Sequence, residues 1–335
     1  MQNVLFVLLD GMEDHPHPEL GGKKPYEVAN MPFIRKKASH LHWTTGRGYT
    51  QLFLNEFWSG HPPDISRGAI EAYGLAMDMS EGRIAFRMSP AFIDGKNVKW
   101  AYGVDDMVDD LVECVKENMY LLDDCNPQIE YSVHGRSVIT MEYPYDIPDN
   151  TPQAPIDGPY VPIPGPLGEM IVHIASEMDG LTIYPWGIGK VGKLYPPHEC
   201  VKHMTTVSSS LTALGISATL GHKIQLVPDI EERVKIAREA LKRGHVFLHM
   251  DEVDEYSHEK NAKKKIAVLE KIDRLMEEYF SDVDNLVFFV DHGTSCVTGT
   301  HILMDVPFRT DIEAFKDGEM VELATLVPKL MEKRK

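Results

Sequence analysis

Three mainly apolar runs that end beside polar side chains constrain the fold of this chain more than any other feature. They span residues 3–9, 245–250 and 285–290, and Asp10 and Asp291 directly follow the first and the third run. Runs of this kind predict strands that are buried on both faces of a parallel sheet. Because ligands bind at the carboxyl ends of the strands in an open α/β sheet, we expect the polar side chains after these runs to converge there.

The side chains around these strand ends have the chemistry of a metal-binding set. Six of them are carboxylates or imidazoles: Asp10, Asp254, His258, Asp291, His292 and His301. Asp254 and His258 are four residues apart, so one helical turn would point both at a single ion, with His301 as a third ligand. The other three could hold a second ion, and two divalent ions together form an apparatus for phosphoryl transfer. The alternative is that each aspartate only caps the helix after its strand.

Charge and composition exclude several kinds of partner. The formal net charge is −17, whereas a nucleic-acid surface needs clustered Lys and Arg, so we expect no nucleic-acid partner. No apolar run approaches the length of a membrane span, and residues 1–9 lack the basic start of a signal peptide, so we expect no membrane partner. The four cysteines have no metal-like spacing, which favours a reduced, cytoplasmic setting. The sequence does not define an oligomeric state.

Alternating helix and strand patterns on both sides of a central segment predict the fold class. They indicate an α/β protein whose core has three layers and a mostly parallel sheet. Helical spacing is found at residues 25–39, 67–75, 168–178, 208–214, 230–242 and 260–280, and a further strand at 181–185. We assign residues 1–82 and 167–335 to this metal-binding core.

Residues 83–166 have a different pattern, which predicts an inserted α+β domain. Two strand-like runs meet at an Asp-Gly turn, and a helix at 105–120 is followed by two more runs within 129–143. The tract 144–166 holds eight prolines in 23 residues, which excludes a helix and predicts a stiff connector. We interpret the domain as a lid and the proline-rich tract as its hinge.

Motifs along the whole chain, in order, resemble those of one known family. They are LLDGMEDHP, KPYEVANMP, SGHPPDISRGAIEAYGLAMDM, IAFRMSPAFIDG, WGIGKVGK, DEYSH, and DHGTSC followed by His301 and MDVPF. The chain resembles the cofactor-independent phosphoglycerate mutases of archaeal type, which belong to the alkaline phosphatase superfamily.

The resemblance implies a fold, an activity and a cofactor. The fold is an alkaline-phosphatase-like core with an inserted lid. The activity is that of a glycolytic isomerase, a phosphotransferase that moves a phosphoryl group on a small phosphorylated acid through a hydroxyl nucleophile. Two divalent ions are implied, one held by Asp254, His258 and His301 and the other by Asp10, Asp291 and His292. Mixed imidazole and carboxylate donors make Mn²⁺ or Zn²⁺ the expected metals.

The sequence departs from the family at the nucleophile. The position of the family's nucleophilic Ser falls on Gln51, and a shift of one residue gives Thr50. A threonine hydroxyl activated by a metal can serve as a nucleophile, so we predict Thr50. Ser59 is the second choice, and the remaining alternative is that no nucleophile is present.

The sequence also departs from the family in the lid. The stretch MEYPYDIPDNTPQ lacks the arginines that the family has there. Arg136 and Lys190 are our first choices for binding substrate anions, with His134 and Arg67 as further candidates. These departures leave two alternatives open: a metal-dependent phosphohydrolase or phosphotransferase of other specificity, and a non-catalytic metal-binding homologue.

Overall fold

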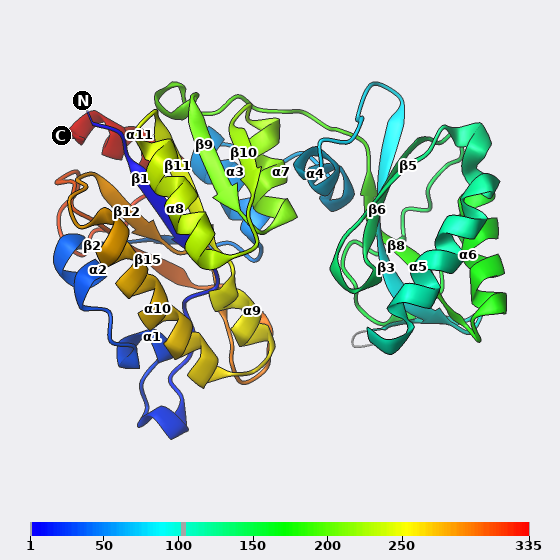
Figure 1. Ribbon diagram of the computed structural model, residues 1–335, viewed down its shortest axis with the longest axis horizontal. Coiled ribbons are helices and arrows are strands. Elements are labelled where there is room, and N and C mark those ends of the chain that lie inside the picture. Colours follow the sequence, from blue (N-terminus) through cyan, green and yellow to red (C-terminus); the bar gives the residue numbers. More distant parts are fainter. Residues whose placement is uncertain (1, 102–104, 335) are drawn as a thin grey trace. The chain divides into compact units, whose positions relative to one another are not determined.

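The structure is a computed structural model that describes residues 2–101 and 105–334. By its contacts the chain forms two compact units (Figure 1). The core unit contains residues 1–63 and 195–335, and the inserted unit contains residues 64–194. Each unit has its own sheet and its own buried side chains.

A seven-stranded sheet forms the centre of the core unit, in the order β10-β9-β11-β1-β12-β15-β2. Its strands are β1 (Leu5–Leu9), β2 (His40–Thr45), β9 (Met204–Ser208), β10 (Lys223–Leu226), β11 (His245–Met250), β12 (Leu286–Phe289) and β15 (Asp305–Thr310). The five strands from β10 to β12 run parallel, β15 is antiparallel to β12, and β2 is antiparallel to β15. A separate ribbon pairs β13 (Gly293–Thr294) with β14 (His301–Ile302).

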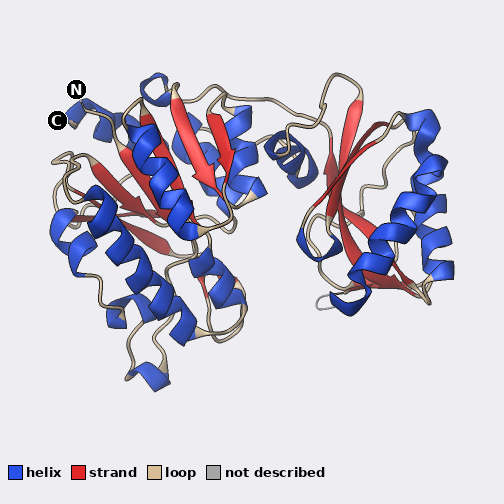
Figure 2. Cartoon of the chain, in the orientation of Figure 1, coloured by secondary structure: helices blue, strands red, loops and turns tan. Residues whose placement is uncertain are grey.

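Helices cover both faces of this sheet, which gives three layers (Figure 2). On one side are α1 (Pro25–Val28), α2 (Pro32–Lys37), α8 (Ile230–Leu241) and α10 (Ala262–Phe280). On the other side are α3 (Thr50–Ser59), α7 (Leu211–Thr219) and α11 (Leu323–Lys333). The short α9 (Glu252–His258) follows β11, and two 3₁₀ turns lie at Pro18–Leu20 and Glu199–Val201.

Aromatic packing anchors α3 against the sheet. The ring of Phe57 on α3 lies 4.5 Å from the ring of Phe289 between centroids, and the ring of Trp58 lies 5.1 Å from that of Phe6. Both rings are fully buried, and their burial is worth several kilocalories per mole by the usual area relation. This packing fixes the helix beside β1 and β12, whose carboxyl ends carry Asp10 and Asp291.

The inserted unit is an antiparallel α+β structure. Its sheet has the order β5-β6-β3-β4-β7, with β8 paired to β3. The strands are β3 (Arg83–Ile93), β4 (Asn97–Trp100), β5 (Gln128–Tyr131), β6 (Ser137–Glu142), β7 (Gly158–Pro159) and β8 (Leu181–Gly189). The helices are α4 (Arg67–Gly74), α5 (Val108–Asn118) and α6 (Pro166–Glu177), with 3₁₀ turns at Asp105–Met107, Met119–Cys125 and Val133–Gly135.

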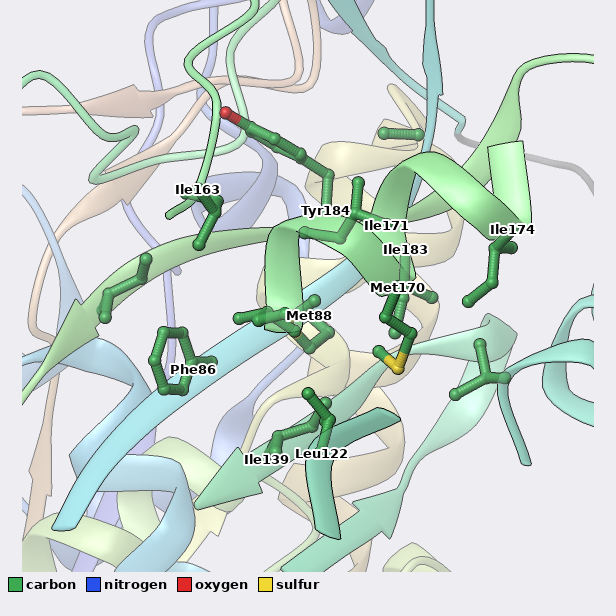
Figure 3. Packing of buried hydrophobic residues seen from close by; sticks show 14 of the residues in the cluster. Phe86, Met88, Leu122, Ile139, Ile163, Met170, Ile171, Ile174, Ile183 and Tyr184 are labelled. Carbon is green, nitrogen blue, oxygen red and sulfur yellow. The ribbon is translucent and has the colours of Figure 1, made fainter. Parts of the chain in front are cut away.

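The inserted unit has its own hydrophobic core. Phe86 and Met88 on β3 and Ile183 on β8 pack against Met170 and Ile171 on α6 (Figure 3). On the opposite face, small side chains of α4 pack against β3 and β6. The unit therefore buries both faces of its central strand without using the other unit's core.

The predicted fold class is confirmed: a three-layer α/β core with a mostly parallel sheet, and a separate α+β part. Two predicted helices differ, and the one expected at residues 208–214 begins only at Leu211, because Ser208 is the last residue of β9. The helix expected at residues 25–39 is two short helices, α1 and α2, separated at residues 29–31. Pro32 has no N–H to continue the hydrogen-bond ladder and disfavours helical torsion angles at Met31, so the helix restarts at the proline.

The boundaries of the two compact units differ from those of the predicted domains. Helices α4 and α6 and strand β8 pack with β3, so residues 64–82 and 167–194 join the inserted unit. The proline-rich tract 144–166 lies inside that unit, where β7 pairs with β4, and it is therefore not the connection between the units. Residues 102–103, which belong to the predicted second strand of the hairpin, lie outside the described residues.

Candidate metal centre

The six predicted metal ligands all lie at the carboxyl edge of the core sheet. Asp10 directly follows β1, and Asp291 and His292 follow β12 after one residue. Asp254 and His258 lie on α9, the helix that follows β11. His301 begins β14, in the ribbon that extends from this edge. They form two groups, and within each group the possible ligand atoms lie within 4.8 Å of one another.

The first group contains Asp10, Asp291 and His292, and it is buried. The Nε2 atom of His292 lies 3.3 Å from Oδ1 of Asp10 and 3.3 Å from Oδ2 of Asp291. The other oxygen of Asp291 accepts hydrogen bonds from the backbone N–H groups of Gly11 and His292. Oδ2 of Asp291 is buried without a hydrogen bond, so it is available to a cation.

The second group contains Asp254, His258 and His301. Each histidine ring gives its Nδ1–H to a backbone carbonyl, His258 to Gly299 at 2.7 Å and His301 to Gly48 at 2.8 Å. The Nε2 atoms therefore face Asp254, at 3.1 and 3.8 Å, and lie 3.1 Å from each other. In neutral rings both Nε2 atoms are acceptors, and an ion between them would satisfy both, as backbone-oriented metal ligands do.

The electrostatics of both groups also fit a bound cation. Burial, together with the charges of Asp291 and Asp254, raises the pKa of Asp10 well above its usual value. Although burial opposes ionisation, the hydrogen bonds that His258 and His301 donate through Nε2 when their rings are protonated, without a metal ion, hold the pKa of Asp254 well below its usual value. Three carboxylates at one sheet edge repel one another unless positive charge lies among them, so the residues present suit divalent metal.

Gly11 allows the two groups to approach each other. Its φ is +60°, and a Cβ atom there would meet Oδ1 of Asp254 and Oγ1 of Thr294. Thr294 in turn donates a hydrogen bond to Asp254. The rings of His292 and His301, one from each group, stack at 4.1 Å between centroids. The Asp-Gly pair after β1 thus permits one continuous cluster of ligands.

Thr50 lies beside the first group. It is the first residue of α3. Its Oγ1 atom is 3.2 Å from Nε2 of His292 and 3.4 Å from Oδ1 of Asp10. The amide N–H groups at the start of a helix attract anions, so this hydroxyl occupies a position that suits a phosphoryl group.

Ser59, the second choice for a nucleophile, lies elsewhere. It is the last residue of α3, nine positions from Thr50, which is roughly 13 Å along a helix at 1.5 Å per residue. Its buried hydroxyl donates a 2.6 Å hydrogen bond to the carbonyl of Asn55. The geometry gives Ser59 a structural contact at the helix end and no contact with the ligand groups.

His249 is a polar residue of the centre that sequence reasoning missed. It is fully buried in β11, with Nε2 2.8 Å from Oδ2 of Asp10 and Nδ1 2.8 Å from Oγ of Ser208. Burial lowers the pKa of His249, so the neutral ring can donate to Asp10 and accept from Ser208. An imidazole in the interior of an apolar strand was the signal that could have identified it.

We expect His249→Phe to weaken divalent-ion binding by about ten- to a hundredfold, because a hydrogen bond that orients a ligand carboxylate is lost. His249→Gln, whose amide can still donate to Asp10, should retain more of the affinity. Isothermal titration of Mn²⁺ into metal-free protein measures the effect, and His203→Gln at an exposed histidine is the control. Unchanged affinity in folded His249→Phe would mean that His249 only packs.

The predicted substrate-binding residues all lie in the inserted unit. Arg67 on α4 pairs with the buried Glu71 at 2.7 Å, and Glu71 also lies 2.6 Å from Nε of Arg87 on β3. Both guanidinium groups lie over the Trp186 ring. Burial lowers the pKa of Arg87, and the nearby charge of Arg136 contributes to this. The structure thus brings three arginines together.

The other two predicted substrate residues are exposed side chains. Lys190 directly follows β8, and His134 lies in a 3₁₀ turn with φ at 58°. We define the arginine cluster as Arg67, Arg87 and Arg136. Among the residues that the structure describes, no helix is long and apolar enough to cross a membrane.

One segment of the core unit is similar to a known family model. Residues 195–324 match the family model described as the Metalloenzyme superfamily. This segment contains Asp254, His258, Asp291, His292 and His301, and it indicates that the protein uses divalent metal.

The same comparison identifies more particular relatives. The chain is 24% identical over 356 residues to the 2,3-bisphosphoglycerate-independent phosphoglycerate mutase of Picrophilus torridus, with 92% of this chain and 88% of that protein covered. It is 23% identical over 373 residues to the mutase of the same name from Methanocorpusculum labreanum, with 96% and 90% covered. The resemblance to cofactor-independent, metal-dependent phosphoglycerate mutases that the motifs predicted is therefore confirmed.

Solved structures show the same fold. The PH0037 protein from Pyrococcus horikoshii has a TM-score of 0.71 at 20% identity and covers 100% of this chain and 98% of its own. The cofactor-independent phosphoglycerate mutase from Thermoplasma acidophilum has a TM-score of 0.58 at 19% identity, with 99% of each chain covered.

Proposed function

We propose that this protein is a two-metal phosphotransferase that moves a phosphoryl group between hydroxyls of a small phosphorylated acid, as a cofactor-independent phosphoglycerate mutase does. The observation that carries the proposal is the Thr50 hydroxyl, 3.2 Å from His292 and 3.4 Å from Asp10. Both neighbours belong to a group suited to a metal ion. A nucleophile beside metal ligands is the arrangement that phosphoryl transfer through the enzyme requires.

In this proposal Asp10, Asp291 and His292 hold one ion, and Asp254, His258 and His301 hold the other. Mn²⁺ and Zn²⁺ are the expected metals because the donors mix imidazole and carboxylate. When bound, the ions lower the pKa of the nearby hydroxyl and neutralise charge on the transferring phosphoryl group. We also propose a cytoplasmic location, since the four cysteines are free thiols in the structure.

The chemical steps assigned to this chain's residues are two transfers. Oγ1 of Thr50 loses its proton and forms a bond to the substrate phosphorus, while the bond from phosphorus to the substrate oxygen breaks and that oxygen takes up a proton. In the second transfer a different hydroxyl of the same acid loses its proton and forms a bond to phosphorus, while the bond from phosphorus to Oγ1 breaks and Oγ1 takes up a proton, which restores Thr50. The amide groups at the start of α3 stabilise the phosphoryl oxygens.

We propose that the arginine cluster binds the phosphate or carboxylate of the substrate. Two of its guanidinium groups share the buried Glu71, which holds them in fixed positions and leaves the cluster with an excess of positive charge. Fixed guanidinium groups are suited to bidentate binding of planar or tetrahedral anions. Lys190 and His134 remain proposed as further anion contacts.

We expect Arg136→Gln to raise KM by roughly ten- to a hundredfold, which corresponds to the loss of one charge-assisted hydrogen-bonding group. Arg136 is the better test than Arg67 or Arg87, because it can be replaced without removing an ion pair to Glu71. Lys99→Gln, an exposed cation on β4, is the matched control. Equal KM values in the two variants would argue against the arginine cluster as the substrate site.

The experiment that tests the proposed function compares isomerisation with phosphate release. Protein loaded with Mn²⁺ is incubated with 3-phosphoglycerate and with a panel of other phosphorylated small acids. Positional transfer without phosphate release supports the mutase. Phosphate release alone would support the second candidate, a phosphohydrolase, which is favoured by the lack of arginine in the stretch 141–153. Metal binding with neither reaction would support the non-catalytic homologue.

A further inference from the structure

A cavity of about 100 Å³ lies in the core unit, and none of the six candidate ligands lines it. It lies between one face of the sheet and the segment that carries α1 and α2, and it is open to solvent at one end. The sheet contributes Leu9, Leu41, Trp43, Phe288 and Val290 to its lining, and α2 contributes Ile34. The strand register brings these side chains together. Phe288 on β12 pairs with Arg309 on β15, and Arg309 pairs with Leu41 on β2.

The lining changes in character from one end of the cavity to the other. Leu9, Ile34, Phe288 and Val290 are buried and apolar. Arg309 is half-buried and Arg35 is exposed, and both also line the cavity. The cavity therefore joins an apolar interior to a cationic, solvent-facing end, which is the usual form of a site for an amphipathic small molecule.

Among the residues that the structure describes, Arg35 and Tyr26 are the titratable neighbours that act on the Arg309 guanidinium, and no salt bridge joins it to a carboxylate. Burial lowers its pKa, and the neighbouring positive charge of Arg35 lowers it further. Arg35 uses its side chain to bind the backbone carbonyls of Tyr26 and Ala29. The carboxylate of the nearby Asp273 is also engaged, because it accepts hydrogen bonds from the backbone N–H groups of Phe33 and Ile34.

Two adjacent guanidinium groups without a shared carboxylate repel each other, and partial burial increases the cost. This pair exists in a chain whose formal net charge is −17, yet among the described residues neither guanidinium forms a salt bridge with a carboxylate. An anion bound from solution would remove the repulsion and would form charge-assisted hydrogen bonds with both groups. Tyr26, also in the lining, could add a phenol hydroxyl as donor.

We propose that this cavity binds a small carboxylic acid with a compact apolar body, held by Arg35 and Arg309. The body occupies the space against Leu9, Phe288 and Val290, and the carboxylate lies on the two guanidinium groups. The enclosed volume of about 100 Å³ is smaller than the roughly 150 Å³ of a dry cavity that accommodates benzene, so a single ring would enter only in part and would extend toward the open, cationic end. The site is separate from the proposed phosphotransferase function, although Leu9 and Val290 directly precede Asp10 and Asp291.

Calorimetric titration of metal-loaded protein with benzoate tests the proposal, with benzamide as the neutral probe of the same shape. We expect saturable binding of one benzoate per chain, with an affinity about tenfold or more above that of benzamide, as one charge-assisted group would give. Arg309→Met keeps an apolar stem of similar length and removes the charge. It should lower the affinity for benzoate about tenfold and leave that for benzamide within about twofold.

Two further variants complete the test. Lys36→Met removes a positive charge from an exposed neighbouring position of α2 and should leave benzoate binding unchanged. Ile34→Phe fills the apolar end of the cavity and should abolish binding of both probes. Absence of saturable benzoate binding, equal affinity for the two probes, or undiminished benzoate binding in Arg309→Met would overturn the proposal.

Discussion

Thr50→Ala should lower turnover by roughly three orders of magnitude or more, because it removes the only hydroxyl that we assign to accept the phosphoryl group. Divalent-ion binding should remain within a few-fold of the unmodified protein, since the six carboxylate and imidazole ligands are unchanged. Thr50→Ser keeps a hydroxyl at the start of α3 and should retain activity. Steady-state kinetics and Mn²⁺ titration together separate these effects.

Thr45→Ala is the matched control for this substitution, because Thr45 is an exposed threonine at the end of β2, five residues before Thr50. It should leave both turnover and metal binding unchanged. Full turnover in Thr50→Ala would remove Thr50 from the mechanism and would favour direct attack by a metal-activated water. That outcome would change the proposed function from mutase to hydrolase.

Asp291→Asn should weaken binding of one divalent ion by about a hundredfold or more, because it neutralises a carboxylate that we assign as a direct ligand of the ion. The effect should exceed that of His249→Phe, because His249 only orients a ligand. Asp291 is fully buried, and its Oδ2 atom has no hydrogen bond. The same substitution should raise the melting temperature of the metal-free protein, because the charge of Asp291 contributes to raising the pKa of Asp10.

Differential scanning calorimetry with and without Mn²⁺ measures both consequences. In the unmodified protein, metal at a hundred times its Kd should stabilise the folded state by about 2.7 kcal/mol for each site. Asp291→Asn should lose the contribution of one site. Asp305→Asn, at an exposed aspartate on β15, should behave like the unmodified protein. A full metal-induced shift in Asp291→Asn would exclude Asp291 as a ligand.

The positions of Asp10, Asp254 and Asp291 could be predicted from the sequence because each follows an apolar run directly or within one helical turn. Such runs become adjacent parallel strands, and strand β1 lies between β11 and β12. Local sequence thus determined which edge of the sheet each carboxylate would reach. The prediction needed no knowledge of strand order, because all parallel strands end at the same edge.

Other features depended on contacts between distant residues and could not be predicted. His249 contacts Asp10 only because β11 pairs with β1 in the observed register. Strand β8 joins the inserted unit because it pairs with β3, although the sequence from 167 onward continues the helix and strand alternation of the core. The sequence did not predict helix α3 either. Its aromatic side chains are held by packing on the sheet, and this tertiary contact overrides the local helix propensity.

The central claim is that Thr50 carries the phosphoryl group during turnover, and peptide mapping of quenched enzyme tests it most directly. Metal-loaded protein is mixed with a substrate that it isomerises, quenched in acid within one turnover, digested and analysed by mass spectrometry. The account predicts a phosphate on Thr50 that is absent without substrate or divalent metal. Phosphate on another residue, or isomerisation without any phosphorylated peptide, would contradict it.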